Sequence, residues 1–151
     1  MTQLINAFEI GKEVGQLDMK FNSNVIQVRA DSALVAGQAV KIVDAAGGIP
    51  NVTAVTADTD EVFGYVVHSI KKSSVAIGEV TEIAMAGSIM FMQAGAAVSA
   101  GVELMYVTAT GKMVTATGVT KVISGWALDK AASDGIFRVY ITAPAFKKPT
   151  A

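Results

Sequence analysis

Glycine recurs throughout the chain, and the stretches between the glycines are rich in Val, Ile and Thr. No stretch keeps apolar residues at helical spacing for three turns without a glycine or a run of β-branched residues. This pattern favours short strands joined by tight turns, because glycine tolerates the positive φ that hairpin turns require. We therefore predict an all-β fold in which long helices are nearly absent.

Ten strands are predicted where apolar and β-branched residues lie between turn residues. They are residues 24–30, 39–44, 50–55, 62–68, 79–85, 88–93, 103–108, 112–116, 120–128 and 136–142. Three small loops, Ala36-Gly37, Ile77-Gly78 and Ala100-Gly101, each lead into an apolar strand. Either one hairpin unit is repeated, or the likeness is a coincidence in a chain rich in Gly, Ala and Val. Because one hairpin buries too little, we expect a small barrel or sandwich of repeated Gly-turn hairpins.

The first 24 residues differ in character from the rest. They are too apolar for a solvated tail, yet polar residues and glycines break them up too often for a separate core. We predict an extended N-terminal arm over 1–24, a β domain over 25–144 and a flexible C-terminal tail over 145–151. The arm is expected to dock on this domain or on another subunit. Its candidate contact residues are Leu4, Ile5, Phe8, Ile10 and Val14.

The chain has no cysteine and one histidine, His68. Disulfides, thiolate nucleophiles, cysteine-type zinc sites and a two-histidine metal site within one chain are therefore excluded. His68 has no orienting partner nearby in the sequence, which a general base requires. Asp58, Asp60 and Glu61 lack the glycine and distal glutamate of a calcium-binding loop, so a solvated turn is predicted there. We expect no enzyme activity, no metal site and no cofactor.

Charges are few and balanced: the chain has 12 Lys and Arg and 13 Asp and Glu, which gives a net charge of −1. A nucleic-acid-binding protein usually has a basic face, so no nucleic-acid partner is expected. Between Glu82 and Glu103 lie 20 uncharged residues, a length that suits a membrane-spanning helix. Gln93 at the centre and three glycines interrupt this run, and no Lys, Arg, Trp or Tyr marks an interface. We predict two buried strands and a loop, and no membrane partner.

Methionines and an aromatic residue cluster within this uncharged run. In a strand, Met90 and Met92 share one face and Phe91 takes the other. Apolar residues on both faces indicate either a strand buried on both sides or a strand with one exposed apolar face that can bind another protein. Core packing is one interpretation. A subunit contact through Met90 and Met92 is the other, because Met and aromatic residues are enriched at interfaces.

Three stretches of the chain share an order of features with one known family. They read VAGQAVKIVDAAGGIPNVTAVTADTDEVFGYVVHSIKKSSVAIGEV, AAVSAGVELMYVTATGKMVT and VISGWALDKAASDGIFRVYITAP. A small residue and a glycine precede a strand, an acidic turn precedes Phe-Gly-Tyr-Val-Val, and Gly-x-Ala-Leu-Asp precedes an Ala/Asp/Gly turn. Over residues 34–144 this order resembles the small cement or decoration proteins of tailed bacteriophage capsids.

The resemblance implies a structural virion protein without catalytic residues. Such proteins are β-rich and often trimeric, and they lie on the outer surface of the assembled capsid, where they stabilise the shell. The implied partner is the major capsid protein of the same phage, and the implied oligomer is a homotrimer. Arms in this family commonly contact the shell or a neighbouring subunit. The arm residues, together with Met90 and Met92, are then capsid or inter-subunit contacts.

Two other functions fit the same sequence. A tail or baseplate β-module of a virion has the same composition and the same lack of candidate catalytic residues. A small-ligand-binding β-barrel is the second alternative. Its cavity would be lined by Trp126, Tyr65, Tyr106 and Met92.

Overall fold

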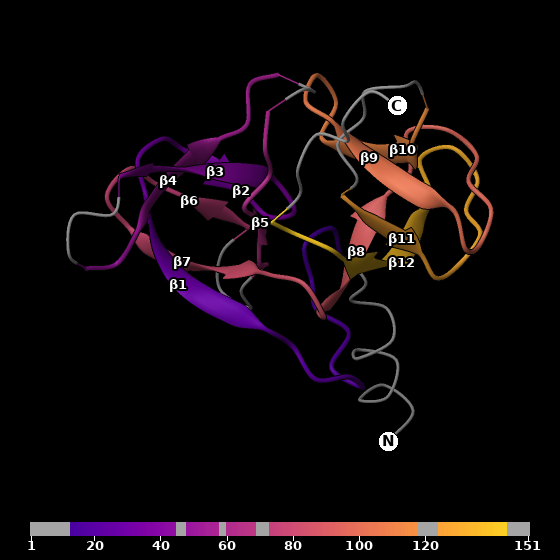
Figure 1. The fold of residues 1–151 in the computed structure, drawn as a ribbon, viewed down its shortest axis with the longest axis horizontal. Helices are drawn as coiled ribbons and strands as arrows, with labels where there is room; N and C mark the ends of the chain where they lie inside the picture. Colours follow the sequence, from indigo (N-terminus) through magenta and orange to yellow (C-terminus); the bar gives the residue numbers. More distant parts are fainter. Residues whose placement is uncertain (1–12, 45–47, 58–59, 69–72, 118–123, 145–151) are drawn as a thin grey trace, which may run out of the picture.

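The computed structural model describes residues 13–44, 48–57, 60–68, 73–117 and 124–144 (Figure 1). This part of the chain forms twelve strands, and none of its residues forms a helix that could cross a membrane. The strands are β1 (Val25–Ala30), β2 (Leu34–Val35), β3 (Ala39–Asp44), β4 (Asn51–Ala54), β5 (Gly64–Val66), β6 (Ser74–Val75), β7 (Val80–Ala84), β8 (Ile89–Gln93), β9 (Glu103–Val107), β10 (Lys112–Thr115), β11 (Gly125–Ala127) and β12 (Ile136–Ile141).

Five strands close into a barrel in the order β1-β4-β3-β5-β7, on the left of Figure 1. β1 runs parallel to β4, and the other neighbouring pairs are antiparallel. Along each strand, alternate side chains point to opposite faces, so the inward set packs together inside the barrel. The residues buried in this cluster are Val28, Ala30, Leu34, Val40, Val52, Val66, Val75 and Ile83.

The other five long strands form a second sheet in the order β10-β9-β11-β12-β8, on the right of Figure 1. All of its neighbouring strands are antiparallel. Its two ends approach each other just after β8, where the Gly95 N–H donates to the Met113 carbonyl oxygen at 2.8 Å. The sheet is therefore strongly curved around its own buried face.

One hydrophobic core joins the barrel to the second sheet. Tyr65 of β5 and Tyr106 of β9 pack edge to face, with ring centroids 6.0 Å apart. Ala39 and Ala84 of the barrel belong to the same buried cluster as Met113 of the second sheet. The two halves are thus held together by apolar packing, which is the dominant favourable term in folding.

The predicted all-β fold is confirmed, and each of the ten predicted segments contains an observed strand. The glycines of the three predicted loops, Gly37, Gly78 and Gly101, have φ of 80°, 86° and 84°, the left-handed region that favours glycine. The sequence prediction missed β2 and β6. Two-residue strands are too short to show alternation, and they form here because Leu34 pairs with Val75. The predicted tail, 145–151, lies outside the described residues.

Candidate interaction surfaces

The first described residues lie along the free edge of β8. The Gly15 N–H donates to the Phe91 carbonyl oxygen, and the Phe91 N–H donates to the Gln16 carbonyl oxygen, each at 2.8 Å. Further along, the Asp18 N–H donates to the Ile89 carbonyl oxygen at 2.9 Å. A free sheet edge presents unpaired backbone groups that other segments can bind, and here the chain covers its own edge.

The described part of the predicted arm therefore docks on its own domain, which is one of the two alternatives left open by the sequence. Residues 15–18 of the predicted arm pair with β8, so this part of the arm packs against the β domain. The remaining candidate contacts of the arm lie outside the described residues. These are Leu4, Ile5, Phe8 and Ile10.

Val14, the fifth candidate contact of the arm, is half-buried and packs against the large core. A Cβ on Gly37 would lie 2.5 Å from Val14 Cγ1, and a Cβ on Gly15 would lie 2.5 Å from the Gly37 nitrogen. Both glycines have positive φ, of 86° at Gly15 and 80° at Gly37. The described residues of the predicted arm, 13–24, which we call the arm segment, thus pack closely against the loop before β3 at Gly15 and Gly37. Val14 contributes to this contact within the chain.

Arg138 of β12 connects the arm segment to the second sheet. Its Nε and Nη2 donate to the two carboxylate oxygens of Asp129, each at 2.8 Å. Its Nη1 lies 3.6 Å from Oδ2 of Asp18, whose side chain is buried. The hydrogen bonds to Asp129 raise the pKa of Arg138 above its ordinary value. A bidentate pair of this kind fixes the orientation of both side chains in addition to balancing their charges.

Replacing Arg138 by methionine is expected to lower the free energy of unfolding by about 1–3 kcal/mol, because the buried carboxylate of Asp18 loses its cation. Urea denaturation measures the loss. The control is Lys112→Met, which removes the more exposed pair with Asp134 at 2.5 Å and is expected to cost at most about 1 kcal/mol. Equal losses in the two variants contradict a structural role for the Arg138 cluster.

His68 also holds the arm segment. Its Nε2 lies 2.6 Å from Oε2 of Glu13, and its backbone N–H donates to the Gly15 carbonyl oxygen at 2.8 Å. The side chain is only 18% exposed, whereas that of Glu13 is 62% exposed. His68 thus holds Glu13 and Gly15 next to the end of β5.

Met90 and Met92 are both 0% exposed and lie in the core shared by the barrel and the second sheet. Neither side chain presents surface to another chain. Their assignment as contact residues is therefore corrected in favour of core packing. The physical reason is that β8 is covered on its inner face by the barrel residues.

The residues proposed to line a ligand cavity are not brought together around one. Tyr65 and Met92 are 0% exposed and Tyr106 is 6% exposed, and all three pack in the core. Trp126, by contrast, is 43% exposed on the outside of the second sheet. Burial raises the pKa of both tyrosine hydroxyls, which remain neutral. The ligand-cavity assignment of these four residues is therefore wrong.

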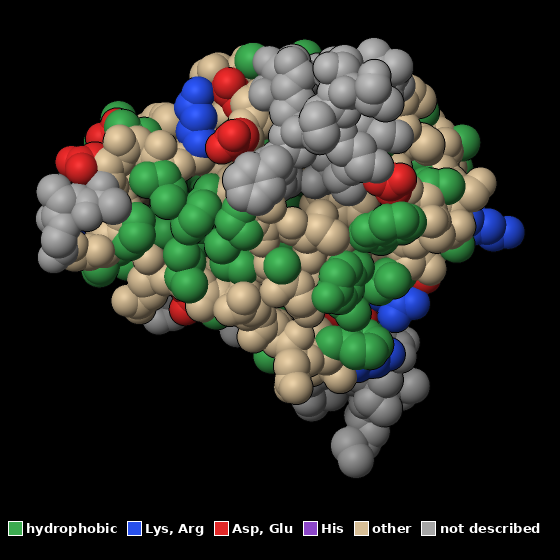
Figure 2. All heavy atoms as spheres, viewed as in Figure 1, with side chains coloured by type: hydrophobic (Ala, Val, Ile, Leu, Met, Phe, Trp, Pro, Cys, Tyr) green, Lys and Arg blue, Asp and Glu red, His purple; other side chains and the backbone are tan. Residues whose placement is uncertain are grey.

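An apolar patch covers the outer face of β11 and β12 (Figure 2, right). Trp126 and Tyr140 lie directly opposite each other on the two strands. The four members of this patch, which we call the outer patch, are between 39% and 44% exposed. They are Trp126, Leu128, Ile136 and Tyr140.

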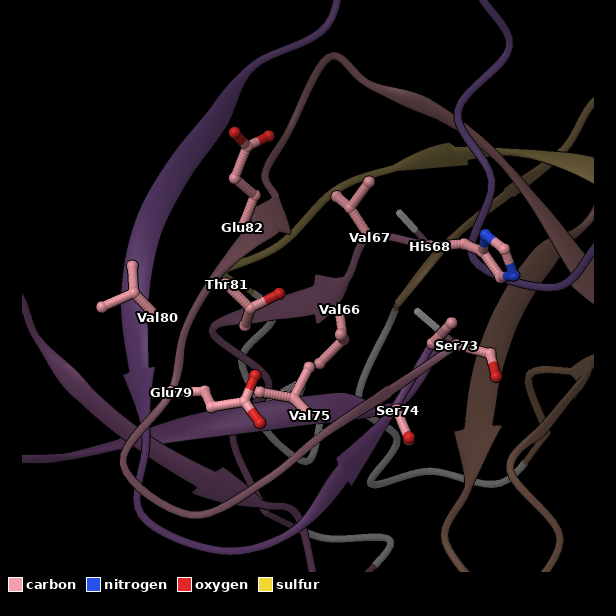
Figure 3. A pocket seen from close by; sticks show the side chains of 11 residues that line it. Val66, Val67, His68, Ser73, Ser74, Val75, Glu79, Val80, Thr81 and Glu82 are labelled. Atoms are coloured by element: carbon pink, nitrogen blue, oxygen red, sulfur yellow. The ribbon is translucent and has the colours of Figure 1, made fainter. Parts of the chain in front are cut away.

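A pocket of about 380 Å³ lies on the other half of the molecule, between β6 and β7 (Figure 3). Its lining combines apolar and polar side chains. We call it the β6–β7 pocket. The apolar residues are Ala36, Val66, Val67, Val75 and Val80, and the polar ones are His68, Ser73, Ser74, Glu79, Thr81 and Glu82.

This fold is similar to that of a bacteriophage head fiber. The solved structure is the N base of head fiber gp8.5 in bacteriophage phi29, with a TM-score of 0.55 and 16% sequence identity. The match covers 85% of this chain and 100% of that chain. No family description and no curated protein match the sequence. The shared property is the fold, which spans the whole of the head-fiber base.

The acidic turn that was considered as a cation site is used for local structure. The Asp60 carboxylate accepts hydrogen bonds from Lys41 Nζ at 2.9 Å and from the backbone N–H groups of Thr56 and Ala57, each at 3.2 Å. The bond from Lys41 is the main reason why the pKa of Asp60 is lowered. Asp58 lies outside the described residues. Among the residues the structure describes, no three acidic or histidine side chains are grouped as metal ligands would be.

Sequence reasoning missed the outer patch, although a signal for it was present. In β12, Phe137, Val139 and Ile141 point inward, and Ile136 and Tyr140 point outward. An antiparallel strand with one solvated face ordinarily has polar residues there. Ile136 and Tyr140, on either side of Arg138 on the outward face, were therefore a signal for an exposed apolar patch.

Proposed function

We propose that this chain is a structural protein of a bacteriophage virion that binds the outer surface of the assembled capsid and stabilises it. Its partner is the major capsid protein, its oligomer is a homotrimer, and its role is not enzymatic. The observation that carries this proposal is the fold, which is similar to a phage head-fiber base over that structure's whole length. The resemblance of residues 34–144 to capsid cement proteins points the same way.

The outer patch is the surface that we propose for the capsid contact. Its Trp126 and Tyr140 are the residue types that most often dominate binding energy at protein interfaces. Burial of apolar surface contributes about 25 cal/mol for each Å² removed from water. An oligomer repeats the contact, and each further attachment is effectively intramolecular, which raises avidity by about 10² to 10⁴. A shell held this way must break several contacts at once to separate.

The test is co-sedimentation of the purified chain with capsids of the parent phage that lack it. We expect saturable binding to heads, and a trimer mass in light scattering of the free protein. A chain that is monomeric and stays in the supernatant contradicts the proposal. Binding to tails and not to heads contradicts it as well, and supports the tail or baseplate alternative.

The double change Trp126→Ser and Tyr140→Ser is expected to weaken capsid binding at least about thirtyfold, because each removes a large contact side chain at the centre of the outer patch. The measurement is the concentration for half-saturation in the same sedimentation assay. The matched control changes Ile42 and Val43 to serine on β3, where the side chains are 42% and 51% exposed. Equal effects of the two double variants contradict the assignment of the outer patch.

A further inference from the structure

The second sheet repeats the strand order of the barrel. Each of its five strands has one counterpart in the barrel with the same neighbours and the same relative directions. The counterparts are β8 for β1, β9 for β3, β10 for β4, β11 for β5 and β12 for β7. β8 also runs parallel to β10 at the bridge between Ala94 and Met113, as β1 runs parallel to β4. The repetition seen in the sequence therefore extends to a whole five-strand unit.

Backbone hydrogen bonds recur at matching positions of the two units. In the first unit, the Asp31 N–H donates to the Val52 carbonyl oxygen at 2.8 Å. In the second, the Gly95 N–H donates to the Met113 carbonyl oxygen, also at 2.8 Å. Three further pairs of bonds match in the same way: Gly37 to Val66 and Gly101 to Ala127, Val67 to Glu82 and Leu128 to Arg138, and Met85 to Asn24 and Ile141 to Ser88. Each unit can therefore be used to interpret the other.

The two units differ at one strand edge. In the second unit, the arm segment covers the edge of β8 by bonding to the backbone of Ile89 and Phe91. These are the first and third residues of β8, and the first and third residues of β1 are Val25 and Gln27. The matching edge in the first unit is therefore the start of β1, and we call residues 25–27 the β1 edge.

The β1 edge is open among the residues that the structure describes. The Ala30 N–H donates to the Glu79 carbonyl oxygen of the β7 side, so alternation directs the backbone groups of Val25 and Gln27 away from β7. β4 lies on that other side, but it pairs only with Arg29 and Ala30 at the far end of β1. No described residue bonds to the outward N–H and carbonyl groups of Val25 and Gln27. Such groups are a template for one more strand.

The second unit shows what kind of segment fits this edge. Leu17 of the arm segment lies opposite Met90 in an antiparallel bridge and packs against the large core. The counterpart of Met90 is Ile26, the second residue of β1, which is half-buried and packs against the barrel core. An antiparallel segment with one apolar side chain opposite Ile26 therefore fits the β1 edge as the arm segment fits β8.

The β1 edge is adjacent to the outer patch. The backbone N–H of Asn24, just before β1, donates to Ser88 Oγ at 2.9 Å. The carbonyl oxygen of Ser88 accepts from the Ile141 N–H at 2.9 Å, and Tyr140 of the outer patch precedes Ile141 on β12. The β1 edge and the outer patch thus meet where the two units join, and one partner can contact both.

We propose that the β1 edge binds an extended segment of the major capsid protein as an added antiparallel strand, with an apolar side chain of that segment opposite Ile26. This inference rests on the proposed function and names the kind of segment that the partner supplies. In such pairing, main-chain hydrogen bonds give affinity, and the side-chain position opposite the edge gives specificity. The capsid contact then has two parts, the aromatic side chains of the outer patch and the backbone groups of the β1 edge.

Amide hydrogen exchange of the full chain, free and bound to capsids that lack it, tests the added strand. In the free chain we expect the Val25 and Gln27 amides to exchange at least about tenfold faster than those of Ile26 and Val28, which face β7. Capsid binding should slow the exchange at Val25 and Gln27 by at least about tenfold.

Protection of both amides in the free chain, which a second copy or another part of this chain would give, overturns the proposal. Capsid binding that leaves both rates unchanged also overturns it, and the proposed function then still stands. A chain that does not bind capsids contradicts the proposed function and this proposal together.

Two changes at Gln27 separate backbone pairing from a side-chain contact. Gln27→Pro removes the outward N–H without removing a bond to β7, and proline is tolerated at strand edges. We expect it to weaken capsid binding at least about tenfold in the sedimentation assay, and Gln27→Ala, which keeps the N–H, to weaken it less than about twofold. Equal weakening by the two variants overturns the proposal. Urea denaturation shows whether both variants fold, and the exchange experiment needs neither of them.

Discussion

Replacing Met92 by alanine is expected to lower the free energy of unfolding by about 2–5 kcal/mol. The side chain is 0% exposed in the core that joins the barrel to the second sheet, and its residue pairs with Phe137 of β12. Truncation removes buried apolar atoms and leaves a cavity that the packed neighbours fill only in part. Urea denaturation measures the loss, and light scattering in parallel measures the mass of the proposed homotrimer.

The control for this prediction is Met19→Ala, the same chemical change at a side chain that is 86% exposed. Its expected effect is within about 0.5 kcal/mol of zero. If Met92→Ala leaves stability unchanged but dissociates the proposed homotrimer, the interpretation of this residue as a subunit contact is restored. Core packing requires the opposite pattern, with a large loss of stability.

The second large effect is expected for Gly15→Ala, which should lower the free energy of unfolding by about 2–4 kcal/mol. The φ of Gly15 is +86°, which costs an L-residue about 1–2 kcal/mol. The added Cβ would also lie 2.5 Å from the Gly37 nitrogen and 2.9 Å from the Ala36 carbonyl carbon. Because these are backbone atoms, the contact is relieved only if the arm segment moves away from the loop before β3.

Gly78→Ala isolates the packing part of this effect. Gly78 has the same φ of +86°, but nothing lies within 4 Å of the position its Cβ would take. Its expected cost is therefore the conformational part alone, about 1–2 kcal/mol. Urea denaturation compares the two variants, and limited proteolysis of residues 13–18 shows whether the arm segment is released. Equal stabilities together with equal proteolysis contradict the close packing of Gly15 against Gly37.

The strands were predictable because their signals are local. Alternation in β12 and the glycine turns before β3 and β9 depend on neighbouring residues only. Which side chains are exposed was less predictable, because exposure depends on elements that are distant in the sequence. Met92 and Trp126 both occur in short apolar strands, and local sequence gives no measure of which face another element will cover. Met92 is 0% exposed, whereas Trp126 is 43% exposed.

The amino-acid sequence by itself determined that the chain is all-β, where its turns lie, and that cysteine and paired-histidine chemistry are absent. These properties follow from residue types and short-range spacing. Only the tertiary structure decided that β1 pairs with both β4 and β7 to close a barrel, that the segment at Gly15 covers the edge of β8, and that Trp126 lies outside. The reason is that strand pairing joins residues far apart in sequence, and the face that is buried depends on what packs against it.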